Sequence, residues 1–147
     1  MGLLEQITAD MKKAMKNKQK DKMKVLRLLR SDLKTAKIDK KGEFTEEDAM
    51  AVITKAAKNR RESIESYKKG DRADLVEEEQ KELEVIEEYL PEQMSDDDIK
   101  KLVEEVIEET GASGMQDMGQ VMGTIMPKVK GKADGSKVQA IVRSKLA

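Results

Sequence analysis

Apolar residues recur every three or four positions along the chain, in stretches that short polar breaks separate. This spacing places the apolar side chains on one face of a helix. The first stretch predicts a helix that ends near residues 17–19, on the evidence of Leu4, Ile7, Met11 and Met15. The second predicts a helix over residues 20–39, with an apolar face formed by Val25, Leu26, Leu29, Leu33 and Ala36.

Two further helices are predicted before Pro91. The segment "TEED" at 45–48 places a capping hydroxyl, Thr45, ahead of three acids that favour the positive end of a helix. The helix that follows is expected to stop at Gly70. Asp71 is expected to cap the next helix, which halts before Pro91 because the residue preceding proline disfavours helical backbone.

The last third of the chain predicts three shorter helices. Ser95 and the three acids behind it repeat the capping signal, and this helix is expected to end at Gly111. The sixth helix is predicted from Met118, Val121, Met122, Ile125 and Met126. The spacing of methionines 115, 118, 122 and 126 favours core packing over an adaptable partner groove. Pro127 is expected to end this helix, and Asp134 to cap the seventh.

These elements predict an all-α protein without strands. The segment "PEQMSDDD" is the best candidate boundary, which gives a four-helix N-terminal bundle over residues 1–93 and a three-helix C-terminal bundle over residues 94–147. The second bundle is small enough to be marginal by itself, so we expect it to pack against the first bundle or a partner.

Composition removes several kinds of chemistry. The chain has 147 residues, with no Cys and no His. Disulfides, thiolate catalysis, His-based zinc sites and the commonest general base are therefore excluded. No apolar run is long enough to cross a membrane, and no Asp-x-Asp loop has the spacing of a metal site. We expect a cytoplasmic protein with no catalytic residues, metal, cofactor or membrane partner.

Charge is distributed unevenly, which bears on partners. Net charge is −1, yet residues 1–40 and 111–147 are basic and residues 71–110 are strongly acidic. Along the second helix six basic residues share an arc of about 140° at 100° per residue. This basic face consists of Lys20, Lys24, Arg27, Arg30, Lys34 and Lys37. It could meet an external partner, or it could dock on the acidic fourth or fifth helix.

A second basic segment is "PKVKGKADGSK", residues 127–137. Lysines neutralise phosphates, and a glycine lets a ligand approach the backbone closely. The candidate RNA-binding residues here are Lys128, Lys130, Gly131, Lys132 and Lys137. The alternative is a solvated basic turn that complements the dipole of the sixth helix. Because the chain has only one Phe and two Tyr, RNA contacts should involve backbone and shape, not base stacking.

Three segments resemble the bacterial YqeY family: the opening "LLEQITADMKKAMKNKQKDKMKVLRLLRSDLK", "YLPEQMSDDDI" and "MGQVMGTIMPKVKGKADGSKV". The resemblance extends along essentially the whole chain. The last third also resembles the tail of the B subunit of aspartyl/glutamyl-tRNA amidotransferase, in which "GQVM" precedes "KGKA". Here these motifs are Gly119–Met122 and Lys130–Ala133, separated by a longer spacer that contains Pro127. The resemblance implies a pair of helical bundles and a contact between the tail and the body of a tRNA.

The resulting hypothesis is a helical accessory protein that binds tRNA or structured RNA and has no catalysis of its own. The phosphorylating site and the amidase partner of the amidotransferase are not encoded here, so any carbon–nitrogen ligase role would be an accessory one. The alternative hypothesis is a protein–protein interaction module whose basic helix and acidic middle meet complementary partners.

Overall fold

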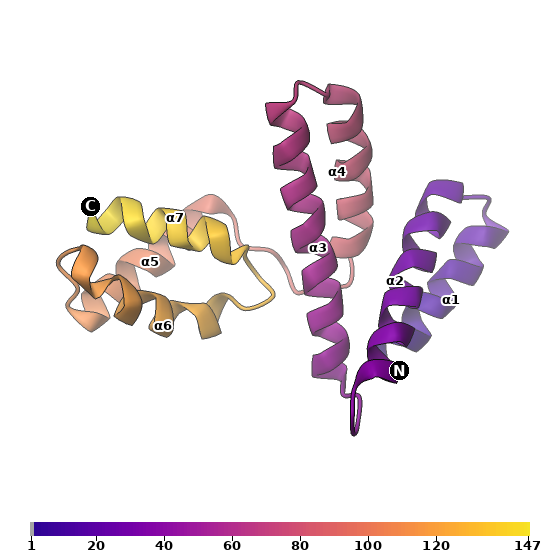
Figure 1. Ribbon diagram of the computed structural model, residues 1–147, viewed down its shortest axis with the longest axis horizontal. Helices are drawn as coiled ribbons and strands as arrows, with labels where there is room; N and C mark the ends of the chain where they lie inside the picture. The colour runs from indigo at the N-terminus through magenta and orange to yellow at the C-terminus, as the bar shows by residue number, and fades with distance from the viewer. Residues whose placement is uncertain (1) are drawn as a thin grey trace. The chain divides into compact units, whose positions relative to one another are not determined.

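The computed structural model describes residues 2–147, and all of the regular structure in them is helical (Figure 1). The elements are α1 (Leu3–Lys16), α2 (Lys20–Asp39), α3 (Glu46–Lys69), α4 (Ala73–Glu87), α5 (Asp96–Thr110), the short 3-10 helix η1 (Met115–Asp117), α6 (Met118–Val129) and α7 (Gly135–Leu146). The prediction of an all-α fold is confirmed.

The predicted capping residues at Thr45 and Ser95 are confirmed. The Thr45 hydroxyl accepts a hydrogen bond from the Asp48 amide at 3.1 Å, and the Asp48 carboxylate accepts one from the Thr45 amide at 2.8 Å. Ser95 and Asp98 form the same reciprocal pair at the start of α5. Each pair satisfies amides that a helix start leaves without partners, which fixes where α3 and α5 begin.

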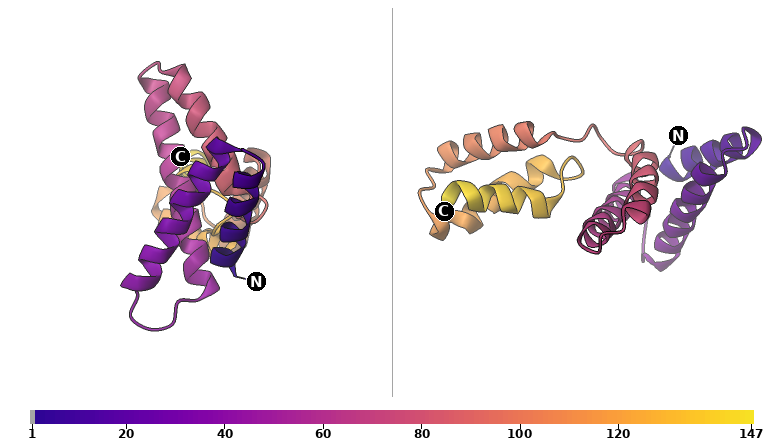
Figure 2. Two further views of the ribbon diagram at one scale, coloured as in Figure 1. Left: turned by 90° about the vertical axis from the view of Figure 1, so that its right-hand side faces the viewer. Right: turned by 90° about the horizontal axis from the view of Figure 1, so that it is seen from above.

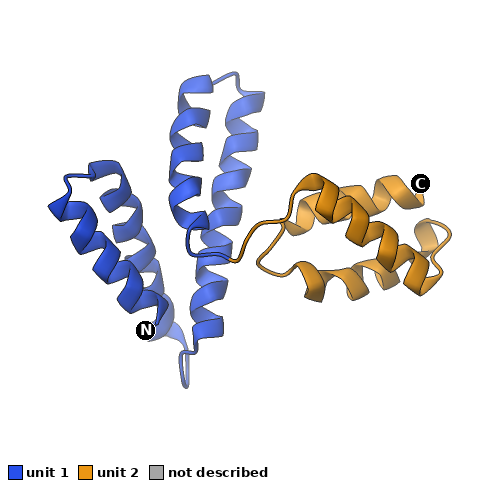
Figure 3. Cartoon of the chain, turned by 180° about the vertical axis from the view of Figure 1, so that it is seen from behind, with its two compact units in different colours: residues 1–90 blue, residues 91–147 orange. Residues whose placement is uncertain are grey.

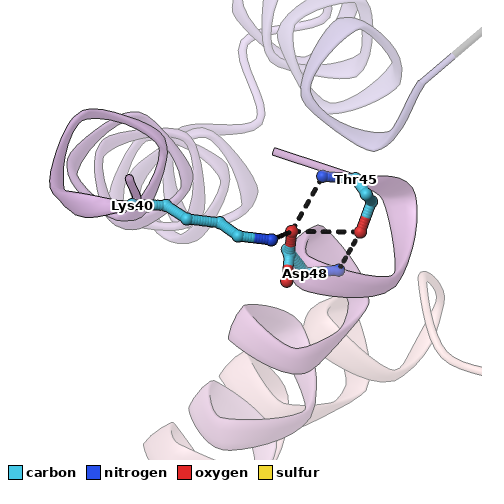
Figure 4. Close-up of polar contacts among 3 residues, drawn as sticks. All are labelled: Lys40, Thr45 and Asp48. Atoms are coloured by element: carbon cyan, nitrogen blue, oxygen red, sulfur yellow. Dashed lines mark hydrogen bonds and ion pairs between the residues drawn. The ribbon is translucent and has the colours of Figure 1, made fainter. Parts of the chain in front are cut away.

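The Asp48 carboxylate also forms an ion pair with a lysine at the C-terminal end of α2 (Figure 4). The Lys40 ammonium pairs with the Asp48 carboxylate, next to its bonds with Thr45. The hydrogen bond from Lys40, followed by that from the Thr45 backbone, lowers the pKa of Asp48 from 3.8 to about 2. The turn between α2 and α3 is therefore closed by a carboxylate that is stable in its ionised form.

The predicted cap of α4 is wrong. Arg72, not Asp71, is the N-cap residue, and no side chain caps this helix. Asp71 instead adopts the left-handed conformation, with φ +57°, as the chain reverses out of α3. Asp tolerates that conformation better than most residues, so it serves the turn and not the helix start. The predicted end before Pro91 is correct, because α4 stops at Glu87, a turn ahead of the proline.

The chain divides into two compact units, residues 1–90 and 91–147 (Figure 3). In unit 1, α1 lies antiparallel to α2, and α3 lies antiparallel to α4 (Figure 2). The two pairs share one core, whose fully buried side chains include Ile7, Leu26, Leu29, Leu33, Ile53 and Ile86. The buried Tyr89 hydroxyl donates a 2.6 Å hydrogen bond to Asp10, which ties the segment after α4 to α1.

Unit 2 packs α5, α6 and α7 around a second core of small aliphatic side chains. These include Ile99, Val103, Val106, Val121, Ile125, Val129, Val138 and Val142. The methionine series is divided: Met118 and Met122 pack against this core, whereas Met115 and Met126 are 45% and 37% exposed. Core packing is thus correct for two of the four. Pro127 lies inside α6, which continues to Val129.

None of the helices within residues 2–147 combines the length and the apolar character needed to span a bilayer.

Candidate nucleic-acid interface

The basic segment 127–137 starts inside α6 and ends inside α7. Lys128 lies in the last turn of α6, Lys137 lies in the first turn of α7, and residues 130–134 connect the two helices. Gly131 has φ +77°, a conformation that L side chains rarely adopt. The glycine is therefore required by the turn, whatever it contacts. The amides of Lys132 and Ala133 both bond to the Val129 carbonyl, at 2.8 and 3.1 Å, which tightens the connection.

The connection is held from outside by the segment that precedes α5. The Gln93 side-chain amide donates to the Gly131 carbonyl at 2.9 Å, and the Met94 backbone amide donates to the Lys132 carbonyl at 2.9 Å. Gln93 also donates to the Pro91 carbonyl at 2.8 Å. Because two successive carbonyls are bonded inward, the side chains of this turn project from a fixed backbone. We call residues 128–137, held in this way, the anchored basic loop.

Lys128 and Lys137, both predicted RNA-binding residues, make ion pairs with α5. Lys128 lies 3.4 Å from Glu109, and Lys137 lies 2.5 Å from Asp96. A further lysine of α7, Lys145, pairs with Glu104 at 2.9 Å and lowers the pKa of that carboxyl. All of these side chains are largely exposed, so each pair contributes only about 0–1 kcal/mol. An incoming phosphate could therefore replace the carboxylate at little cost.

The other two lysines, Lys130 and Lys132, lie within the connection itself and are exposed. The expected helix start is also present, because the Asp134 carboxylate accepts from the Ser136 amide at 3.1 Å. This carboxylate occupies the position that an anion would take at the N-terminus of α7. The lysine side chains, and not the amides of α7, are consequently the groups that could meet phosphates.

The basic face of α2 is divided by its surroundings. Lys20 and Lys24 line an open cleft of about 850 Å³ between the first turns of α2 and residues 74–85 of α4, and acids such as Asp74 and Glu77 line it too. The remaining four basic residues do not line this cleft. In this cleft, the residues of α2 that face the acids of the fourth helix all belong to the first turns of α2.

The basic face of α2 makes no ion pair with the part of the chain that the structure describes. Within residues 2–147, none of its six side chains lies within 4.0 Å of a carboxylate oxygen. Arg27, Lys34 and Lys37 are exposed. Arg30 is half-buried, and its Nε atom is buried without a hydrogen-bond partner. A buried donor in that state is unfavourable.

The role of Gln93 is not visible in the sequence. In the sequence, the segment "PEQM" indicates only a domain boundary. Nothing about a glutamine at this position predicts that its side chain bonds to a turn 38 residues further along the chain. The sequence shows that α5 is acidic, but not which of its acids pair with which lysines. Within the described part of the chain, no three Asp or Glu side chains are grouped closely enough to hold a metal ion.

Comparison with known proteins identifies the family. The model of YqeY-like proteins matches residues 4–146. Altered inheritance of mitochondria protein 41, mitochondrial, from Pyrenophora tritici-repentis is 31% identical over 150 residues, which cover 97% of this chain and 82% of that protein. A glutamyl-tRNA(Gln) amidotransferase subunit from Thermococcus sibiricus is 39% identical over 57 residues, 36% of this chain and 9% of that protein. The chain belongs to the YqeY-like protein family.

Proposed function

We propose that this protein binds tRNA or a similarly structured RNA through the anchored basic loop, and that it does so without catalysis of its own. The observation that carries the proposal is the fixed backbone of the loop. Gln93 and Met94 hold the carbonyls of Gly131 and Lys132, and exposed lysines project on both sides of that point. A charged surface that is already ordered loses less entropy on binding than a mobile one.

The ion pairs with α5 fit this role as a resting state. Lys128 and Lys137 can exchange their carboxylates for phosphates, because exposed pairs are weak and phosphate contacts also release condensed counterions. Without a bound RNA, the acids of α5 moderate the local repulsion between lysines. The exchange also selects for dense negative charge, since a single carboxylate ligand would gain nothing over Glu109 or Asp96.

The kind of RNA contact follows from the residues in the loop. Residues 127–137 contain no aromatic side chain, so bases cannot stack on them. Contacts with phosphates and sugars along a folded RNA are therefore expected. Two relatives of this chain are named for a tRNA-dependent enzyme, glutamyl-tRNA(Gln) amidotransferase, which supports tRNA as the first RNA to test.

The experiment measures the affinity of the full chain for total tRNA by fluorescence anisotropy at low salt. Changing Lys130 and Lys132 to Ala should weaken binding clearly. The matched control changes Lys100 and Lys101, two exposed lysines of α5 in the same unit, and should bind as the unaltered protein does. Equal loss in both variants would mean that only net charge matters, and the loop would not be the interface.

A second comparison separates the loop from the basic face of α2. The variant with Lys20, Lys24 and Arg27 changed to Ala should retain tRNA binding. If this variant fails to bind while the loop variant binds normally, the loop is only a helix-terminating turn and the proposal is wrong. Both variants should keep their unfolding free energy within about 0.5 kcal/mol, because exposed substitutions seldom exceed that.

A further inference from the structure

The outer surface of α2 carries two parallel rows of residues with the same spacing. One row is basic and consists of Arg27, Arg30, Lys34 and Lys37. The other follows one position later and consists of Leu28, Ser31, Thr35 and Ile38. Steps of three, four and three residues keep each row on one side of a helix. The second row, which we call the α2 seam, has an aliphatic side chain at each end.

The α2 seam is not part of the core of unit 1. That core takes a different side of the helix, where Leu26, Leu29 and Leu33 are at most 1% exposed. Leu28 and Ile38, in contrast, are 47% and 82% exposed. A single exposed aliphatic residue is ordinary in soluble proteins. Here two lie on one side of one helix, about 15 Å apart along its axis, with only small hydroxyl side chains between them.

The charges on either edge of the α2 seam differ in sign. The basic row follows one edge, and none of its four members pairs with a carboxylate in the described part of the chain. Two exposed acids, Asp32 and Asp39, follow the other edge at helical spacing. Exposed aliphatic side chains with opposite charges on the two edges of their row are a pattern by which paired helices recognise each other.

We infer that the α2 seam is a docking surface for an amphipathic helix of a partner protein. That helix would place aliphatic side chains on Leu28 and Ile38 and a row of Glu or Asp residues along the basic row. The acid row would supply the carboxylates that Arg27, Lys34 and Lys37 lack among residues 2–147. This is recognition of a helix by its apolar stripe, with charge selecting the orientation.

Nucleic acid fits this surface less well. A phosphate backbone gains nothing from contact with Leu28 or Ile38, and it would be repelled by Asp32 and Asp39 on the adjacent edge. The inference concerns unit 1 and does not depend on the anchored basic loop, which lies in unit 2. Failure of either proposal leaves the other standing.

The test uses the full chain and a labelled synthetic helical peptide of about three heptads, with leucine at the seam positions and glutamate along one edge. Anisotropy should show saturable binding. Changing Leu28 and Ile38 to Ser should weaken it at least tenfold, because the aliphatic contacts are lost without a change in charge. Changing Arg27 and Lys34 to Gln should weaken it to a similar degree.

Two controls define the contact. Changing Met15 to Ser removes an exposed apolar side chain, 61% exposed on α1, and should leave binding unaltered. A peptide with lysine in place of glutamate should not bind. The inference is overturned if the acidic peptide does not bind at millimolar concentration, or if the Leu28→Ser/Ile38→Ser variant binds it normally. It is also overturned if that variant loses affinity for tRNA, since the surface would then belong to RNA.

Discussion

Gly123 in the middle of α6 should be replaceable by alanine with a gain in stability. The residue is exposed, and its φ lies outside the positive range that favours glycine. A Cβ atom built on it would meet nothing within 4 Å apart from the helix's own backbone. Gly123→Ala therefore adds no clash. It reduces the conformational freedom of the unfolded chain and should raise the unfolding free energy of unit 2 by about 0.5–1 kcal/mol.

The assay is amide hydrogen exchange on the full chain, which reports α6 separately from unit 1. Amides of α6 that exchange by unfolding of unit 2 should slow by about two- to fivefold, the factor that corresponds to this free energy. The matched control is Gly111→Ala. Gly111 ends α5 with φ +69°, so a side chain there is strained and should lower the stability of the same unit by about 1 kcal/mol. Unchanged or faster exchange of the α6 amides in the Gly123→Ala variant would refute the reasoning. It would indicate that a glycine is needed at position 123 to accommodate Pro127.

Three further predictions concern contacts that hold each unit together. Gln93→Ala should weaken tRNA binding measured by anisotropy without changing the net charge, because the Gly131 carbonyl loses the hydrogen bond that anchors the basic loop. Unaltered affinity would show that this hydrogen bond is irrelevant to binding. Tyr89→Phe should lower the unfolding free energy of unit 1, measured by urea titration, by about 1–2 kcal/mol, because the hydrogen bond from the Tyr89 hydroxyl to the Asp10 carboxylate is lost. An unchanged unfolding free energy would mean that water fully replaces the lost hydroxyl. The pKa of Asp48 is lowered to about 2, so its contribution to stability is complete above its ordinary pKa of 3.8 and is lost as the pH falls through 2. Thermal unfolding followed by circular dichroism between pH 5 and 2 should therefore show a smaller acid loss in Asp48→Asn, and identical profiles would contradict the assignment.

The parts of the fold that can be predicted from the sequence are those that short-range physics decides. Thr45 and Ser95 cap their helices because the partner amide lies three residues away, within the same first turn. Asp71 shows the limit of such signals. Its side chain suits a helix start and a left-handed turn equally, and the reversal after α3 decides in favour of the turn.

The candidate site is predictable in its charge but not in its construction. The lysines of the loop are visible in the sequence, as is the glycine. Gln93 reaches the Gly131 carbonyl across 38 positions, and Lys145 reaches Glu104 across 41. Such contacts depend on how α5 packs against α6 and α7, which the spacing of apolar residues does not specify. The exposed ends of the α2 seam could not be predicted from the sequence for the same reason. Their exposure depends on which side of α2 packs into the core.

The most direct test of the central claim is the salt dependence of tRNA binding. Affinity of the unaltered protein should fall linearly with salt on logarithmic axes, because each neutralised phosphate releases condensed counterions. The variant with Lys128, Lys130 and Lys132 changed to Ala should show a slope that is flatter by about two to three units, whereas Lys100 and Lys101 changed to Ala should leave the slope unaltered. A loop variant with the slope of the unaltered protein, or an unaltered protein that does not bind tRNA at all, would contradict the account.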